Sequence, residues 1–126
     1  MTLKQYKDYF KGAFEWNESI SIGKIDNNQE KAICFYNSKR QLSPVKAIDK
    51  GTYRIKPITI LLKYTKNQDT AEQMADSIFE FFDDRRFTVE GKQVTAQCIY
   101  QTPISLGTDD NGVYEYSFEI NMIEER

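Results

Sequence analysis

The sequence predicts an α+β fold in which one long helix packs across a face of a mixed or mostly antiparallel sheet, with a further helix at the N-terminus. Two patterns predict it. One apolar stripe with helical spacing lies within residues 69–86, and residues 113–122 alternate with the period of two that marks a half-buried strand. The 126-residue length suits a single domain spanning 1–126, and its 40% hydrophobic content can fill a core.

The first expected element is an amphipathic helix over residues 2–16, with Thr2 in the N-cap position. Its apolar side chains recur every three or four residues and form one stripe: Leu3, Tyr6, Phe10, Ala13 and Phe14. Such a stripe can pack on a sheet, on a neighbouring subunit, or on a membrane surface. Because the cationic face of this helix is thin, we expect it to pack on protein.

Two short extended runs follow at 19–25 and 31–37, separated by the turn-like segment "DNNQE". Residues 38–52 then predict a long loop. A loop of this length in a compact domain is often functional, and otherwise it is a solvated connection. The loop is basic, and four of its side chains are candidate residues of a protein interface: Lys39, Arg40, Lys46 and Lys50.

Residues 53–64 predict a central strand, because the segment "ITILL" is apolar on both faces. Pro57 lies within this run. Since proline cannot donate a hydrogen bond to a neighbouring strand, we expect Pro57 at a bulge or at the start of the strand.

The strongest predicted helix begins at Asp69, whose spacing to Glu72 resembles a capping box. It is expected to end near Arg85 and Arg86, which suit the electrostatics of a helix C-terminus. Phe81 lies off the core stripe and is a candidate for a second contact surface. The stripe itself consists of Ala71, Met74, Ala75, Ile78, Phe79 and Phe82.

Two further strands are expected, at 94–100 and 113–122, and both alternate. In the second strand the strict period of two fixes which side chains face the core, and thereby the register of the strand. The expected buried face comprises Tyr114, Tyr116, Phe118, Ile120 and Met122.

An acidic group precedes this last strand, with Asp109, Asp110 and Asn111 next to Gly112. A calcium loop with Gly112 in its sixth position would place Phe118 in the twelfth, where a glutamate ligand is required. The group therefore fails as an EF-hand. Asn-Gly is instead typical of tight hairpin turns, which need positive φ angles. We expect a turn whose three polar side chains are candidate contacts with a neighbouring component.

The residues indicate no catalytic set, and we expect no enzyme activity, cofactor or metal. The sequence contains no histidine, which excludes imidazole-based nucleophile activation and imidazole metal sites. Its glycines form no phosphate-binding loop. Glu115 and Glu119 are the only carboxylate pair expected on one strand face, and we interpret them as edge protection. Cys34 and Cys98 are expected to be core residues, and their spacing leaves a disulfide between them open.

The charge balance also bounds the function. The formal net charge is −2, whereas a dedicated nucleic-acid binder is usually strongly basic. Neither a signal peptide nor a run that could span a bilayer is apparent, so we expect no membrane association and folding in a reducing cytoplasm. Tyrosine, arginine and methionine are enriched at protein interfaces, and an assembly protein is the natural interpretation.

Several segments together resemble the phage minor capsid or tail terminator family of tailed phages and prophages. They are "IGKID" (22–26), "KAICFYN" (31–37), "ITILLKYTKN" (58–67) with the helix "DTAEQMADSIFEFF" that follows it, and the closing "TPISLGTDDNGVYEYSFEINMIEE" (102–125). The resemblance covers nearly the whole chain. One departure is Asp49–Lys50, where the family pattern leads us to expect a glycine-rich turn.

The resemblance implies a structural protein of the virion, located at the head–tail junction and assembled in the host cytoplasm. It would form a ring, typically a hexamer, that caps the head-proximal end of the tail tube. Its partners would be the tail tube protein and the head connector proteins, while DNA passes through without specific binding. Three alternatives stay open: a head completion or connector-stopper protein, a small ligand-binding α+β domain, and a nucleic-acid binder that uses the basic loop.

Overall fold

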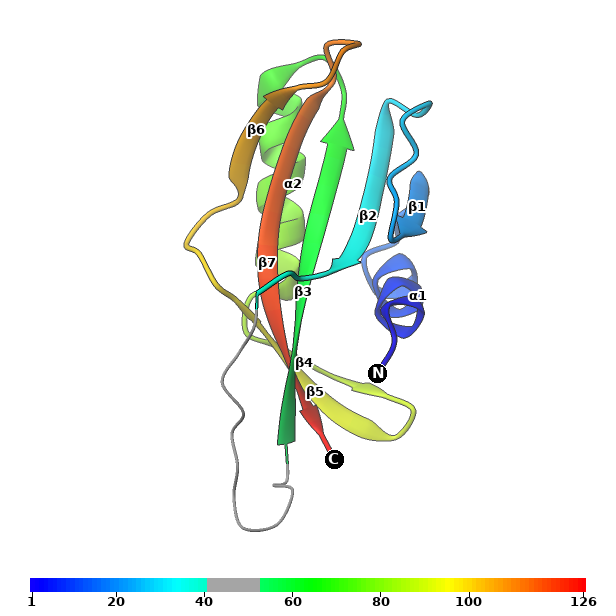
Figure 1. Ribbon diagram of the computed structural model, residues 1–126, viewed down its shortest axis with the longest axis vertical. Coiled ribbons are helices and arrows are strands. Elements are labelled where there is room, and N and C mark those ends of the chain that lie inside the picture. Colours follow the sequence, from blue (N-terminus) through cyan, green and yellow to red (C-terminus); the bar gives the residue numbers. More distant parts are fainter. Residues whose placement is uncertain (41–52) are drawn as a thin grey trace.

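The computed structural model describes residues 1–40 and 53–126. Two helices lie on one face of a seven-stranded sheet, whose strand order is β1-β2-β3-β7-β5-β4, with β6 also pairing with β7 (Figure 1). The α+β class and the mixed sheet are confirmed, because β1 and β2 are parallel and the other strand pairs are antiparallel. The elements are α1 (Leu3–Ala13), β1 (Ser19–Ile22), β2 (Lys31–Asn37), β3 (Tyr53–Tyr64), α2 (Gln68–Phe82), β4 (Arg85–Val89), β5 (Lys92–Cys98), β6 (Ile104–Thr108) and β7 (Tyr114–Glu125).

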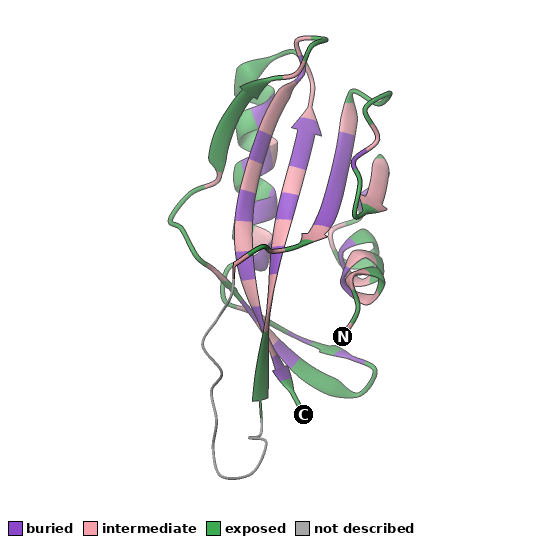
Figure 2. Cartoon of the chain, in the orientation of Figure 1, coloured by how far each residue is buried: buried purple, intermediate pink, exposed green. Residues whose placement is uncertain are grey.

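The two longest strands, β3 and β7, form the centre of the sheet and pair along almost their whole length, with Ile60 opposite Phe118. The alternation predicted for β7 is confirmed: Tyr116, Phe118 and Ile120 are buried on the face that α1 and α2 cover, which we call the inner face. The opposite, outer face carries residues of intermediate exposure from β7. Figure 2 shows buried positions along β2, β3 and β7 and on the side of α2 that packs on the sheet.

The expectation for Pro57 was wrong. It is the fifth residue of β3, in a register with β7 that runs without a bulge. Ser38 N donates to Pro57 O at 3.1 Å, so the backbone groups of Pro57 face the side of β2. β2 has ended there, since its last residue Asn37 pairs with Ile58. A proline is tolerated because its missing N–H points away from β7 and past the end of β2.

α2 carries the predicted core stripe, but its ends differ from the prediction. Its N-cap is Asn67, whose side chain accepts a hydrogen bond from Thr70 N at 3.1 Å; Asp69 lies in the first turn instead. The helix ends at Phe82, because Asp83 is extended and Asp84 has a φ of 56°. Of the stripe, Ala71, Ala75, Ile78, Phe79 and Phe82 are buried, and Met74 packs against them half-buried.

The chain therefore enters β4 where the sequence predicted a helix C-terminus. Arg85 and Arg86 begin this strand, and Phe87 turns into the core. Glu90 and Gly91, with φ angles of 52° and 77°, form the turn that leads into β5. A two-residue turn with both φ angles positive matches the twist of a hairpin.

α1 begins as predicted, with Thr2 and Gln5 forming a capping box. Its apolar stripe packs against protein as we expected, with Tyr6 and Phe10 buried and with Leu3 and Phe14 half-buried. Phe10 is fully buried and stacks on Phe82 of α2, with ring centroids 5.5 Å apart. Ala13 is the exception, because it is exposed. Both helices thus share one aromatic core on the inner face.

Two further features of the sheet were not predicted. β6 pairs with β7 through a bulge between Ser105 and Gly107, and all five of its residues are exposed. β1 pairs with β2 in parallel, which requires residues 23–30 to return along the sheet. Ile25 of this return segment covers Ala32 and Cys34 on the outer face. Within the described ranges, 1–40 and 53–126, no helix has both the length and the apolar character needed to cross a membrane.

Candidate functional site

The candidate interface residues from the sequence fall into three places. Lys39 and Arg40 lie on the outer face of the sheet, and Phe81 lies in α2. The turn of residues 109–112, which we call the hairpin corner, stands at the end of the sheet between β6 and β7. Lys46 and Lys50 lie outside the described residues. The structure does not bring these places together into one site.

A polar network on the outer face anchors the chain where it leaves β2. Ser38 Oγ donates to Glu119 Oε1 at 2.7 Å. Arg40 Nε lies 3.0 Å from the same oxygen and forms an ion pair with it, but not a hydrogen bond. Arg40 also donates through Nη2 to Asn121 Oδ1 at 2.9 Å, and Thr59 Oγ1 lies 3.4 Å from Glu119. Residues about eighty positions apart in the chain are thereby fixed together.

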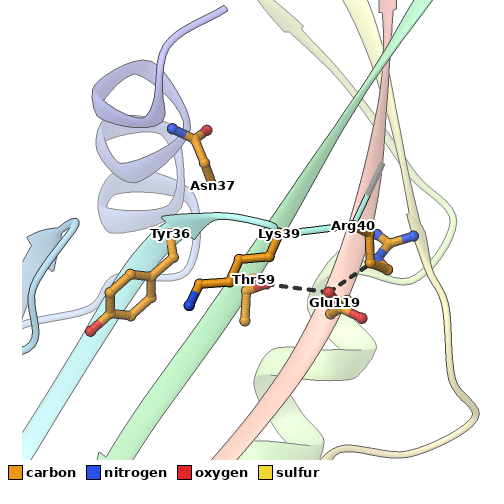
Figure 3. Close-up of a pocket in the computed structure, with 6 residues that line it drawn as sticks. All are labelled: Tyr36, Asn37, Lys39, Arg40, Thr59 and Glu119. Carbon is orange, nitrogen blue, oxygen red and sulfur yellow. Dashed lines mark hydrogen bonds and ion pairs between the residues drawn. The ribbon is translucent and has the colours of Figure 1, made fainter. Parts of the chain in front are cut away.

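The network borders an open pocket of about 520 Å³ on the outer face. Figure 3 shows Lys39 extending across this face beside Thr59, whereas Asn37 points the other way. Lys39 is exposed, so its ammonium group is presented at the surface. The pocket is lined by Tyr36, Asn37, Lys39, Arg40, Thr59 and Glu119.

Glu119 is ionised in this setting. Burial raises the pKa of its carboxyl group, but the hydrogen bond from Ser38 and the charge of Arg40 outweigh burial and hold the pKa below its usual value. A carboxylate with a lowered pKa accepts hydrogen bonds and is a poor proton donor at neutral pH. Glu119, which the sequence paired with Glu115, therefore serves here as an acceptor that holds Arg40.

The hairpin corner is a turn, as predicted. Asp109 Oδ1 accepts hydrogen bonds from Asn111 N at 2.8 Å and Val113 N at 3.0 Å, and Gly112 N donates to Asp109 O at 3.0 Å. Gly112 has a positive φ of 81°, but Asn111 does not, so the expected pair of positive φ angles is wrong. The Asp109 side chain closes the turn, while Asp110 and Asn111 are exposed.

The second oxygen of Asp109 holds a buried lysine. Lys63 Nζ lies 2.7 Å from Asp109 Oδ2, and the Lys63 side chain is 1% exposed. The same ammonium group lies 3.5 Å from both oxygens of Asn27 in the return segment. The hydrogen bond from Lys63, followed by that from Val113 N, lowers the pKa of Asp109. This lysine, which the sequence did not single out, ties the hairpin corner to the outer face.

Replacing Asp109 by alanine should therefore destabilise the fold. The change removes two hydrogen bonds of the turn and leaves the Lys63 ammonium buried without its counter-ion. We expect the free energy of unfolding in urea to fall by about 3 kcal/mol. Asp110→Ala is the matched control and should change it by less than about 0.5 kcal/mol, because Asp110 is exposed. Equal effects of the two changes would contradict the assigned role of Asp109.

Phe81 is engaged within the subunit. Its ring lies 5.6 Å from the Phe10 ring and 5.4 Å from the Phe14 ring of α1, measured between centroids. The guanidinium carbon of Arg85 lies 4.0 Å from the centroid of the Phe81 ring. The second contact surface of α2 thus meets α1, and a role for Phe81 between subunits stays a prediction.

A further buried carboxylate, which sequence reasoning missed, lies on the inner face. Glu124 is 2% exposed and accepts hydrogen bonds from Tyr6 Oη, from Arg54 Nε at 2.6 Å and from the Met1 amino group at 3.2 Å. The only signal in the sequence was that position 124 continues the buried face of β7 beyond Met122. A glutamate at such a position requires polar partners.

At these sites carboxylates act as hydrogen-bond acceptors within the subunit. Glu119, Asp109 and Glu124 each have a lowered pKa and several hydrogen-bond donors around them. In the described part of the chain, no three side chains of the metal-binding kinds gather at one place. Cys34 and Cys98 are free thiols, and burial raises the pKa of Cys98 to about 12, which keeps it protonated.

A comparison with known protein families shows to which family the chain belongs. Residues 11–126, nearly the whole chain, match the family described as bacteriophage tail terminator protein. The chain belongs to the bacteriophage tail terminator family. The resemblance seen in the sequence is thereby confirmed. A comparison with curated proteins gave no match.

Membership of the tail terminator family gives the protein a structural role in a phage virion and an association with other tail components. The outer-face network and the hairpin corner are then features of a terminator subunit. They fix the outer face and the end of the sheet at which they lie.

Proposed function

We propose that this tail terminator caps the head-proximal end of the tail tube as a hexameric ring and joins the tube to the head connector. The observation that carries the proposal is the family match over residues 11–126. DNA passes through the ring without specific binding, which a net charge of −2 favours because the subunit does not attract phosphate strongly.

The shape of the subunit supports a ring. A ring needs two different lateral surfaces on each subunit, so that the contact is heterologous and closes by rotation. The sheet ends in β1 on one side and, beyond β7, in β6 and in β4 on the other, and the edges of β1 and β6 differ in sequence and direction (Figure 1).

Contacts along the tail axis need surfaces other than the lateral edges. The hairpin corner stands at one end of the sheet and presents Asp110 and Asn111 to solvent on a turn that Asp109 and Lys63 hold in place. We assign this corner to contact with a neighbouring ring component. Lys39 and Arg40 on the outer face form the second candidate contact.

Tube assembly in vitro tests the proposal. Tail tube protein should be polymerised alone and with increasing amounts of this protein, and tube lengths measured by negative-stain electron microscopy. We expect substoichiometric amounts to stop elongation, with one additional ring visible at one end of each tube. Sedimentation velocity should show a hexamer alone or in the presence of tube protein.

Two results would contradict the proposal. One is unchanged tube length together with a monomer at every concentration. The other is binding to the head connector without any binding to tubes, which would indicate a connector-stopper instead.

A further inference from the structure

The segment from Gln97 to Thr108 differs from the rest of the surface because it carries no charge. Charged residues make up 29% of the chain, yet these twelve positions contain none. Four of the seven large hydrophobic side chains that are exposed in the described residues lie here: Ile99, Tyr100, Ile104 and Leu106. Exposed apolar surface of this kind commonly marks a protein contact.

The segment contains a free sheet edge as well as apolar side chains. All five residues of β6 are exposed, with Ile104 at 42% and Leu106 at 51% (Figure 2). One edge of β6 pairs with β7, and among the described residues no strand pairs with its other edge. Proteins usually protect such edges with lysine, with inward charges or by covering them. β4, a strand of the same length, begins with Arg85 and Arg86, whereas β6 contains no charged residue and carries only the bulge between Ser105 and Gly107.

The opposite side of the sheet ends in a strand with matching properties. β1 consists of Ser19–Ile22, is also uncharged and exposes Ile22 at 43%. It pairs with β2 on one edge, and the described residues place no strand on its other edge. Figure 1 shows β1 and β6 at the two lateral sides of the sheet.

The strand directions are compatible with pairing between two copies. β1 runs parallel to β2, and each step from β2 to β3, β7 and β6 reverses direction, so β6 runs opposite to β1. A rotation about a ring axis preserves strand direction relative to that axis. β6 of one copy therefore meets β1 of the next in the antiparallel sense, which forms regular ladders.

Charge favours a second copy over a different partner. Around the neutral segment the surface of the subunit is acidic, with Glu80, Asp83 and Asp84 exposed at the end of α2 and Asp110 at the hairpin corner. When identical acidic subunits meet, like charges across the contact are unfavourable. Two uncharged edges avoid this repulsion.

We propose that β6 of one subunit pairs with β1 of the adjacent subunit, so that the sheet continues from copy to copy around the ring. Ile104 and Leu106 lie in this contact against the Ile22 side of β1. The inference rests on the proposed ring and specifies the surfaces that close it. Backbone hydrogen bonds supply affinity, and the apolar side chains of both edges are removed from water.

Cross-linking between engineered cysteines tests the pairing. Ile22→Cys and Leu106→Cys are introduced separately and together in a Cys98→Ser background, in which the remaining native thiol, Cys34, is buried. A short bis-maleimide reagent is used under the conditions in which the wild type assembles. We expect cross-linked dimers when the two single variants are mixed, none from either variant alone, and a ladder ending at the ring from the double variant.

A charge substitution gives a second measurement that does not depend on a reagent. Leu106→Lys should raise the protein concentration needed for ring assembly at least tenfold. The melting temperature of the monomer should stay unchanged, because the side chain is exposed. Thr88→Lys on the exposed face of β4 is the matched control and should assemble like the wild type.

The outcomes distinguish a failure of the β6–β1 pairing from a failure of the proposed terminator function. Cross-linking of Leu106→Cys to itself would show an isologous contact between two β6 strands and overturn the pairing. Rings that form normally in Leu106→Lys, without cross-links in the mixed variants, would overturn the edge assignment and leave the terminator function intact. A wild type that stays monomeric even with tube protein would overturn both.

Discussion

Glu124→Gln is expected to lower the free energy of unfolding by about 3 kcal/mol. The wild-type carboxylate is buried on the inner face and accepts hydrogen bonds from Tyr6, from Arg54 and from the Met1 amino group. A neutral amide of the same shape leaves the amino group and Arg54 without their counter-charge. Urea unfolding at neutral pH measures the loss.

The pH dependence of the free energy of unfolding gives an independent check on the role of Glu124. Burial raises its pKa, but the hydrogen bonds from Tyr6 and Arg54 outweigh burial and leave the pKa in the folded protein below its ordinary value. The unfolded chain then binds the proton more readily than the folded chain. The stabilisation is present above the ordinary pKa, about 4.3, and is lost as the pH falls through the folded pKa. The difference between wild type and Glu124→Gln should shrink over this acidic range.

Glu125→Gln is the matched control, since Glu125 is the adjacent and exposed residue of β7. It should change the free energy of unfolding by less than about 0.5 kcal/mol at every pH. If Glu124→Gln changed the free energy of unfolding at neutral pH as little as Glu125→Gln does, the buried carboxylate would have no stabilising role.

Phe10→Ala is expected to cost about 4 kcal/mol of the free energy of unfolding. Phe10 is fully buried where α1, α2 and β2 meet, with its ring centroid 5.5 Å from that of Phe82 and 5.7 Å from that of Phe35. Truncation removes the apolar area of the ring and leaves a cavity that three rigid elements cannot close. Chemical unfolding, followed by the fluorescence of the nearby Trp16, reports the change.

Tyr53→Ala serves as the control for Phe10→Ala. Tyr53 is an aromatic residue of β3 that is 59% exposed, so its truncation opens no cavity, and a change below about 0.5 kcal/mol is expected. Comparable losses for the two variants would mean that the aromatic core between the helices does not anchor α1.

Local periodicity was a reliable guide wherever one element buries one face. The period of two from Tyr114 to Met122 predicted which side chains of β7 face the core, and the helical spacing from Ala71 to Phe82 predicted the stripe of α2. Both succeed because burial on one side selects apolar residues at the repeat of the backbone. The turn at Gly112 was likewise predictable from the positive φ that glycine tolerates.

The ends of the elements were less predictable, because they depend on contacts beyond the local sequence. Arg85 and Arg86 suit a helix C-terminus, yet they begin β4, where Arg85 lies over the Phe81 ring and donates to Tyr9. Pro57 suits a strand start, yet it lies within β3 because β2 has already ended beside it. Local signals are overridden where tertiary neighbours offer another partner.

By itself, the sequence determined the fold class, the core faces of α2 and β7, and the family to which the chain belongs. The tertiary structure alone decided which polar residues meet: Lys63 with Asp109, Arg40 with Glu119, and Tyr6 with Glu124. The partners lie 46 to 118 positions apart in the chain, and no local pattern relates them. Strand order and register bring them together, because a buried charge is stable only where the fold supplies its counter-charge.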